Sequence, residues 1–464
     1  MGVATDFSHS INSLFKRSTE IAIMRSLTCV KTLVASLLLG AAAVAWAATP
    51  ALVSSAQVPA SASTNAGIIA FATTAPNPKS AYVVAAGLIS NPDLEVMAWM
   101  DPFSSLKQVP NPGVDEDNVP LSVAATGLDS GRVVTADFDQ DSILHIDTWT
   151  IASTGVVKQN GTTTPPNVTN KPSIVEITAV SSTEVVVAFQ DPNSALEVEA
   201  WTIAADGLPT KVLQTGSGIT LGGQFSITTV SANQVLTAAV DTNLNLRVSA
   251  WGVDSAGIST APLSQLTSTG SGVDGFVSSS GPVSIATGSE LESVAIDGGL
   301  FHLLEPVQSA FTPIIDHADI EVVKWRISGA GILSQTNTPS LSTGSTVHTL
   351  YVPSVGACML PQGVQITAYG DIDGSAYAGV YSATGTPYQY NTDIDDPHPI
   401  NNQIVAISAI PAGADNSLRD LFSPWNAYFV LGVLDNNDND AAGTQNNLQI
   451  TVLSYPMRPL LLFP

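Results

Sequence analysis

Cysteine is nearly absent from this sequence, so disulfide bonds cannot stabilise the fold. The chain of 464 residues has two cysteines, Cys29 and Cys358. Cys29 falls in a stretch that we interpret below as a leader, which leaves Cys358 without a partner in the remainder. Stability must therefore come from packing, and a chain of this length can bury enough apolar surface for that.

Positive charge is also scarce. The 15 Lys and Arg residues face 39 Asp and Glu residues, for a formal net charge of −24. Such a surface repels nucleic acids and anionic membranes, so we expect no nucleic-acid partner. The low charged fraction of 12% suits an extracellular β-protein, and the acidity itself favours solubility.

No hydrophobic run is long enough to span a bilayer, and the most apolar stretch has the features of a secretory signal. Residues 24–47 begin with Met-Arg, run apolar from Leu33 to Ala45 and end in Ala-Trp-Ala. A basic start, a short apolar run and an A-x-A exit are typical of a signal peptide. We expect residues 1–47 to be a leader (an upstream extension plus the signal peptide), and the mature protein to be secreted or periplasmic without membrane insertion.

Recognisable catalytic motifs are missing as well. The sequence has no G-x-S-x-G elbow, no P-loop, no dinucleotide fingerprint and no C-x-x-C pair. The histidines after the leader follow no metal-ligand spacing; they are His145, His302, His317, His348 and His398. Motifs therefore identify no enzyme class.

The sequence is rich instead in one repeat, in which alternating apolar residues lead to a tryptophan. In Leu196–Ile203 the apolar and polar residues alternate with a period of two, which predicts a strand. We expect the tryptophan to pack between neighbouring units and not to stack on a ligand. The copies recur about every 50 residues, with longer gaps in the second half; they centre on Trp99, Trp149, Trp201, Trp251 and Trp325, with weaker copies at Tyr381 and Leu453.

Each unit accommodates four strands, best seen in the third copy. The runs there are Ser173–Val180, Glu184–Gln190, Leu196–Ile203 and Pro209–Gln214, separated by turn residues. Units of this make-up resemble the blades of β-propeller repeat proteins, and the resemblance covers residues 60–464. It implies an all-β fold, a seven-bladed β-propeller of four-stranded antiparallel blades over residues 66–464, with six or eight blades still open. A β-sandwich array or a linear solenoid are the alternatives.

A closed ring needs its last blade completed. The outer strand of that blade comes either from the final run Pro459–Phe463 or from Leu52–Val58, within the N-terminal segment 48–65. We favour Leu52–Val58, because an N-terminal strand paired into the last blade leaves no open edge.

Aspartate recurs ten residues before the aromatic position, where the second strand turns into the third. Capping of the hairpin turn explains the single aspartates. Where acidic residues cluster, their oxygens also suit Ca²⁺. The D-x-D-x-D segment 137–141 resembles the calcium loops of integrin-type propeller repeats, although it lacks their glycine and lies on a different turn. The predicted Ca²⁺ ligands are Asp137, Asp139, Asp141, Asp371, Asp373, Asp435, Asp438 and Asp440.

These features favour an exported binding or scaffold protein that holds a glycan, peptide or protein partner on one face of the ring. The rival hypothesis is an extracellular polysaccharide lyase or hydrolase with a metal-assisted site over the central channel. Architecture does not decide between them.

Overall fold

The computed structural model describes strands and turns that all belong to one compact unit, Pro50–Pro464. The predicted leader 1–47 lies outside the described residues. The described ranges are 51–58, 69–77, 80–90, 92–100, 102–103, 105–116, 118–128, 131–152, 157–163, 174–243, 246–267, 283–287, 292–303, 315–328, 330–335, 340–341, 355–360, 364–370, 376–381, 387–393, 403–410, 426–435 and 447–456.

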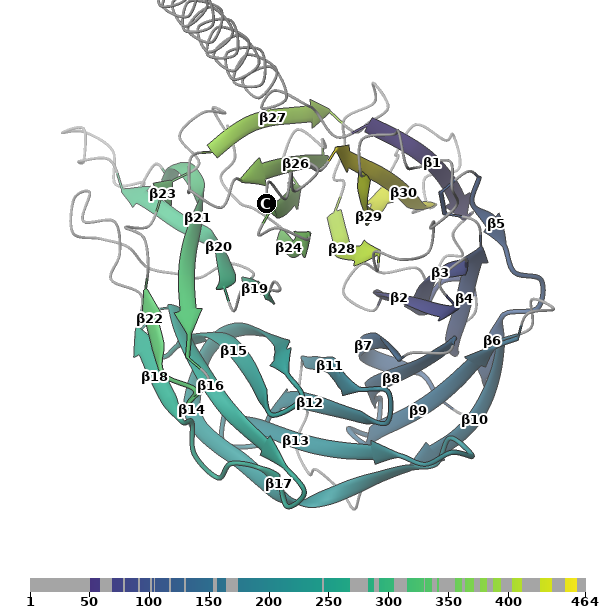
Figure 1. Ribbon diagram of the computed structural model, residues 1–464, viewed down its shortest axis with the longest axis horizontal. Coiled ribbons are helices and arrows are strands. Elements are labelled where there is room, and N and C mark those ends of the chain that lie inside the picture. The colour runs from purple at the N-terminus through teal and green to yellow at the C-terminus, as the bar shows by residue number, and fades with distance from the viewer. Residues whose placement is uncertain are drawn as a thin grey trace, which may run out of the picture. The chain divides into compact units, whose positions relative to one another are not determined.

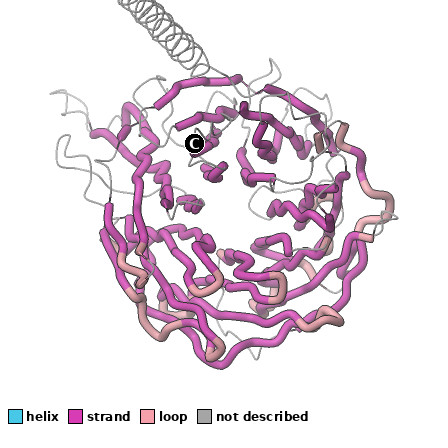
Figure 2. The backbone as a smooth tube through the Cα atoms, in the orientation of Figure 1, coloured by secondary structure: helices cyan, strands magenta, loops and turns pink. Residues whose placement is uncertain are grey.

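In these ranges the chain is all-β, and its strands pair into six sheets arranged as a β-propeller (Figures 1 and 2). The pairing is antiparallel, apart from one parallel contact between Gln214 and Gly257. Within the same ranges no helix is long and apolar enough to cross a membrane.

The first three sheets follow one another along the chain. The first holds β2 (Ile69–Asn77), β3 (Ser80–Gly87), β4 (Leu94–Met100), β5 (Lys107–Gln108) and β6 (Gly113–Asp115); the second holds β7 (Pro120–Leu128), β8 (Arg132–Asp139), β9 (Leu144–Ile151) and β10 (Val157–Thr163). The third holds β11 (Val175–Ser181), β12 (Glu184–Gln190), β13 (Ala195–Ile203), β14 (Pro209–Ser231), β15 (Gln234–Asp241), β16 (Leu246–Asp254), β17 (Gly257–Ile258) and β18 (Ser264–Thr267).

The other three sheets complete the circuit, and the last of them also takes in β1. They are β19 (Val283–Thr287), β20 (Glu292–Leu303), β21 (Ile315–Ile327), β22 (Leu333–Gln335) and β23 (Ser340–Leu341); then β24 (Val355–Leu360), β25 (Val364–Gly370), β26 (Ala376–Tyr381) and β27 (Pro387–Asp393); and finally β28 (Gln403–Ile410), β29 (Asn426–Asp435), β30 (Asn447–Pro456) and β1 (Ala51–Val58).

The third sheet is large because β14 does not stop where the sequence predicts. The expected strand Pro209–Gln214 continues to Ser231, pairing first with β13 and then with β15. Glycine permits this crossing. A Cβ at Gly216 would lie 2.7 Å from Ile258 Cγ2, and one at Gly222 would lie 2.2 Å from the backbone O of Asp241. The outer strand of one blade thus becomes the inner strand of the next without a turn.

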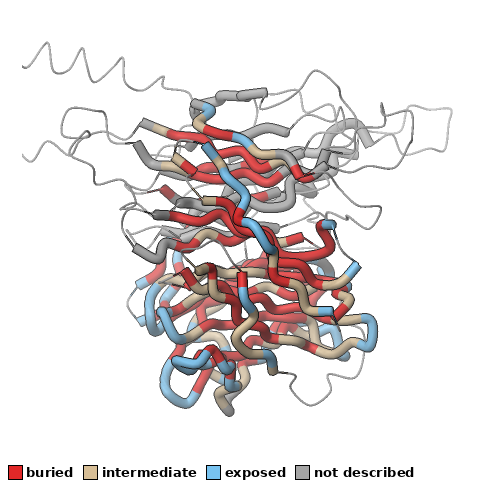
Figure 3. The backbone as a smooth tube through the Cα atoms, turned by 90° about the vertical axis from the view of Figure 1, so that its right-hand side faces the viewer, coloured by how far each residue is buried: buried red, intermediate tan, exposed pale blue. Residues whose placement is uncertain are grey.

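Neighbouring blades pack through two different faces of their third strand. In β9, Leu144 and Ile146 share a core cluster with Trp201 of the following blade, whereas Trp149 points to the opposite side and packs into the cluster that contains Leu94 of the preceding blade. Strict alternation without a bulge in the β8–β9 ladder produces the two faces. These tryptophans are fully buried, and truncating one to alanine typically costs about 3–5 kcal/mol. Figure 3 shows buried strands between exposed turns.

The two ends of the described chain meet in the last sheet. β1 pairs antiparallel with β30 from Ala51↔Ser454 to Val58↔Leu448, which is the pairing favoured for Leu52–Val58. The first sheet, which begins with β2, packs against this last sheet. Phe71 of β2 lies over Gly432 of β29, where a Cβ would come within 2.3 Å of the ring. A shared core cluster joins these two sheets, so the ring is closed.

Candidate functional site

The aspartate turns between second and third strands share one geometry. In both Asp139 and Asp191, Oδ1 accepts hydrogen bonds from the backbone N–H groups two and four residues further on, at 2.9 and 2.8 Å in the first and 2.8 and 2.6 Å in the second. Asp241 Oδ1 accepts the bond from the second residue at 2.8 Å. Each aspartate therefore caps its own hairpin, as turn chemistry predicts.

The second carboxylate oxygen of two of these caps binds a side chain of the third strand. Asp139 Oδ2 lies 3.0 Å from His145 Nε2, and Asp241 Oδ2 accepts a hydrogen bond from Arg247 Nε at 2.6 Å. His145 and Arg247 occupy equivalent positions, four residues before the tryptophan of their strand. Both oxygens of Asp139 are thus engaged within the hairpin, so this carboxylate fixes the turn.

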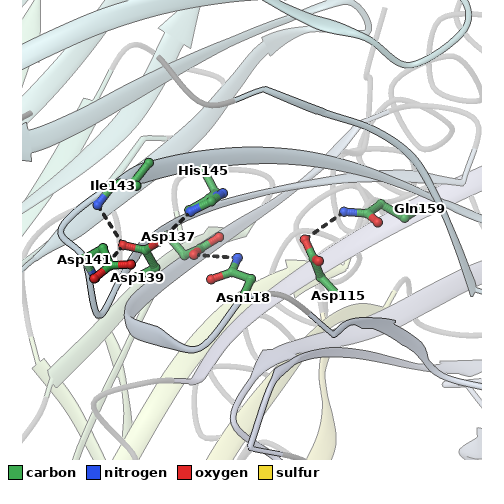
Figure 4. A network of polar contacts seen from close by, with 8 residues as sticks. All are labelled: Asp115, Asn118, Asp137, Asp139, Asp141, Ile143, His145 and Gln159. Carbon is green, nitrogen blue, oxygen red and sulfur yellow. Dashed lines mark hydrogen bonds and ion pairs between the residues drawn. The ribbon is translucent and has the colours of Figure 1, made fainter. Parts of the chain in front are cut away.

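A group of polar side chains lies next to the Asp139 turn, between β6 and the β7–β10 sheet. We call it the buried carboxylate cluster: Asp115, Asn118, Asp137, Asp147 and Gln159. Asn118 Nδ2 donates to Asp137 Oδ2 at 2.9 Å, and Gln159 Nε2 donates to Asp115 Oδ2 at 3.0 Å and to Asp147 Oδ1 at 3.3 Å. Figure 4 shows these residues except Asp147.

Strand alternation places two of these carboxylates inside the protein. Asp137 of β8 and Asp147 of β9 lie on the same side of the sheet as Trp149, which faces the preceding blade. Asn118 joins them from the connection after β6, where its backbone O accepts a hydrogen bond from Leu94 N at 2.8 Å. Asn118, Asp137 and Asp147 are all buried.

Burial dominates the electrostatics of the cluster. It raises the pKa of Asp137 well above the usual range, and the charge of Asp147 raises it further, against the hydrogen bond from Asn118. Burial also raises the pKa of Asp147 to about 6; the side chain of Thr162 opposes this by hydrogen bonding, Asp115 adds to it, and His145 and Gln159 oppose it further. A low-dielectric setting with several like charges penalises ionisation of either group.

Three oxygens of the cluster have no hydrogen-bond partner within the described residues: Asn118 Oδ1, Asp137 Oδ1 and Asp147 Oδ2. A buried acceptor without a donor costs about 1–3 kcal/mol, and more when it is charged. Because Asp137 and Asp147 are fully buried, a polymeric substrate cannot reach them. The chemistry open to the cluster is that of a shared proton or a small bound ion.

The predicted calcium ligands that the structure describes lie in three different settings. Asp137 is buried in the cluster, Asp139 caps the turn, and Asp141 is exposed. Asp435 ends β29, with its side chain outside the described part. Nor is any group of three His, Cys, Asp or Glu side chains in the described ranges placed to hold a metal ion. The remaining predicted ligands also lie outside the described residues: Asp371, Asp373, Asp438 and Asp440.

The sequence analysis did not find the other members of the cluster. Asp147 had a usable signal, because it lies two residues before Trp149 and alternation turns both to the same buried side. Met97 and Ser249 occupy that position in two other blades. Asn118 carried no comparable signal, because it lies between strands and its neighbours are distant in the sequence.

No protein-family model and no curated protein sequence matches the chain. Among solved structures, an α-L-arabinofuranosidase from Fusarium graminearum, bound to an iminosugar inhibitor, is similar with a TM-score of 0.43 at 9% identity, covering 86% of this chain and 97% of that chain. A lectin from Aleuria aurantia, described as a six-bladed β-propeller with a novel fucose recognition mode, has a TM-score of 0.39 at 14% identity, covering 70% and 97%. A mutant of that lectin with alpha-methyl-L-fucoside has a TM-score of 0.40 at 14% identity, covering 78% and 99%. Similarity this distant is not evidence of function.

Proposed function

We propose that the chain is an exported β-propeller that binds a ligand on the face formed by the turns between second and third strands. One observation supports this: three successive blades repeat the same capped turn, each with an exposed polar residue two positions after the aspartate. Those residues are Asp141, Asn193 and Asn243. Carboxylate and amide groups bond well to hydroxyls, so a glycan is the first ligand class and a peptide or protein segment the second.

A glycan array probed with the full chain tests the proposal. The triple variant Asp141→Ala, Asn193→Ala, Asn243→Ala should lose at least about tenfold in affinity, because several hydrogen bonds of about 1 kcal/mol each disappear. The control is Ser182→Ala with Asn233→Ala, two exposed residues on turns at the opposite strand ends. Equal binding by the triple variant, or a ligand lost only in the control, would contradict the proposal.

A polysaccharide hydrolase or lyase is the second candidate, and His145 is the observation in its favour. Its imidazole is held by Asp139 at 3.0 Å and both side chains are 14% exposed, so solvent reaches this candidate general base. Product release from acidic and neutral polysaccharides, compared between the wild type and His145→Gln, tests this. Activity that survives the substitution rules out His145, and the absence of product from any polymer favours the binding protein.

We further propose that the ring has seven blades. The two halves of β14 belong to different blades, which divides the eight-stranded sheet in two. The innermost strands then run β2, β7, β11, β14, β19, β24 and β28, and each contacts the next, with β28 returning to β2. An experimental density map with six or eight repeating sheets would contradict this number.

Export is the last part of the proposal and is supported by the signal-like residues 24–47. Expression of the full chain in a secreting host, followed by N-terminal sequencing of the released protein, tests it. We expect a mature terminus directly after Ala47. Retention of the leader in the cell-associated protein would contradict export.

A further inference from the structure

The three buried side chains with unpaired oxygens are neighbours between two blades. Asp137 is opposite His145 in the β8–β9 ladder, and Asp147 lies two residues further on the same face, so the two carboxylates are diagonal neighbours about 7 Å apart at their Cα atoms. Asn118 Nδ2 donates a hydrogen bond to Asp137 Oδ2 at 2.9 Å, so the amide group adjoins that carboxylate. Each of the three buried side chains therefore brings an unpaired oxygen to this region.

The following blade shows how the fold neutralises a carboxylate at this place. Glu199 is the counterpart of Asp147, two residues before the tryptophan of its strand, and Lys211 is the counterpart of Gln159, directly opposite that tryptophan. Lys211 Nζ forms an ion pair with Glu199 Oε1. Gln159 donates hydrogen bonds at the equivalent position but carries no charge. The first of these blades thus has a neutral amide where the second has an ammonium; its His145, whose charge lowers the pKa of Asp147, pairs with Asp139 instead.

Neither water nor a proton satisfies the cluster fully. One buried water donates two hydrogen bonds, fewer than the three unpaired oxygens, and it brings no charge. A proton on one carboxylate neutralises that group and supplies a single O–H donor, so one of the three oxygens stays unpaired and the other carboxylate stays ionised. A divalent cation would balance both carboxylates and accept all three oxygens as ligands.

We propose that Asn118, Asp137 and Asp147 coordinate a divalent cation, which takes the place of the lysine ammonium found in the following blade. Carboxylate and amide oxygens are hard ligands that suit Ca²⁺, whose flexible geometry accepts bidentate carboxylates, whereas Mg²⁺ demands a near-ideal octahedron. The ion joins the connection after β6 to β8 and β9, and so fastens two blades together. It lies apart from the exposed turns, and the proposal holds whichever ligand those turns bind.

Binding of the metal alone tests the proposal. The full chain, freed of metal by a chelator, is titrated with CaCl₂ by calorimetry and with TbCl₃ while tryptophan is excited. We expect about one equivalent bound per chain, a higher melting temperature, and terbium emission sensitised by Trp149, whose indole bonds Thr135 opposite Asp147. Trp149→Phe should reduce the emission and keep the calcium heat.

Two sets of variants locate the ion. Asp137→Asn and Asp147→Asn preserve side-chain shape and should weaken binding at least roughly tenfold, because ligand charge sets calcium affinity over several decades. Asp141→Asn removes the exposed carboxylate of the same hairpin and should leave binding unchanged. Gln159→Lys should restore the internal ammonium, raise the melting temperature without calcium and abolish the calcium response.

The outcomes are distinct. No heat and no sensitised emission with the wild type would overturn the proposal and leave the protonated carboxylate in its place. Binding lost in Asp141→Asn but kept in Asp147→Asn would place the ion on the turn and also overturn it. Gln159→Lys keeps all three oxygens and so tests the site even if an asparagine variant fails to fold. Loss of its calcium response supports the proposal, and a response equal to that of the wild type contradicts it.

Discussion

Trp149 Nε1 donates a hydrogen bond to Thr135 Oγ1 at 2.9 Å, and Trp251 makes the same bond to Thr237 at the same distance. In the blade between them the threonine position is Val187, and Trp201 Nε1 has no partner among the described residues. The first five copies of the repeat therefore keep a tryptophan at this position, while its hydrogen bond is made in some of these blades and missing in others.

Thr135→Val should lower the free energy of unfolding by about 1–3 kcal/mol, because the substitution leaves a buried indole N–H unpaired. Val187→Thr introduces the missing acceptor next to Trp201. It should destabilise less than Val186→Thr, which buries a hydroxyl on the opposite face of the same strand. Chemical denaturation of the three variants measures this, and equal losses for the two valine variants would argue against the bond.

Asp139→Ala should lower the free energy of unfolding by about 2 kcal/mol, since Asp139 accepts hydrogen bonds from two backbone N–H groups and binds His145. Asp139→Asn keeps an acceptor for the turn and should lose less. The control is Asp141→Ala, an exposed position in the same turn, which should stay within about 0.5 kcal/mol. A loss in the control as large as that of Asp139→Ala would show that the turn as a whole, and not its cap, is sensitive.

Gly127→Ala should destabilise the protein by roughly 3 kcal/mol, the upper end for overpacking, because a Cβ there would lie 1.9 Å from the backbone O of Thr73. The clash is between backbones of the inner strands β7 and β2, so no side chain can move aside. Gly252→Ala is the matched control, since its nearest atom would be a leucine methyl at 3.5 Å. Thermal melting compares the two, and equal midpoints would mean that the inner strands separate easily.

The free energy of unfolding should depend on pH through the side chain of Glu176. Burial raises its pKa from 4.5 to about 8, so the folded state favours the protonated form. Its contribution is complete below about pH 4.5 and disappears as the pH rises through 8, lowering stability by about 1–3 kcal/mol. Denaturation midpoints measured across that range should fall in the wild type and stay flatter in Glu176→Gln. Glu116→Gln, an exposed glutamate, is the control; parallel profiles for the wild type and Glu176→Gln would contradict the assignment.

Much of the architecture followed from local pattern. The strand Glu184–Gln190 has the predicted bounds, and alternation around Trp149 places the indole on the face opposite Leu144, towards the neighbouring blade. The all-β propeller of antiparallel sheets is confirmed, because a buried face with period two specifies strand and side together. The predicted end of the strand at Gln214 was wrong. Glycine is typical of turns, and only the packing partners explain why Gly216 and Gly222 lie within a strand.

The spacing of aspartates in the sequence did not predict the buried carboxylate cluster. Asp137, Asp139 and Asp141 alternate as calcium-loop ligands do, yet a strand end turns the first inward and exposes the last. The partners that Asp137 finds, Asn118 and Asp147, come from a connection and from the neighbouring strand. Contacts of this kind depend on how blades approach one another, which a single sequence does not encode locally.

The antiparallel pairing of β1 with β30 determines how the ring responds to mechanical load. Ala51 is opposite Ser454, so the chain enters and leaves the last sheet at the same end of that ladder. A pull on the segments flanking these two residues loads one residue pair of the ladder at a time, so the seam opens progressively from Ala51 towards Val58. The same arrangement leaves the seam strong against forces directed along the strands, which stress all its hydrogen bonds together.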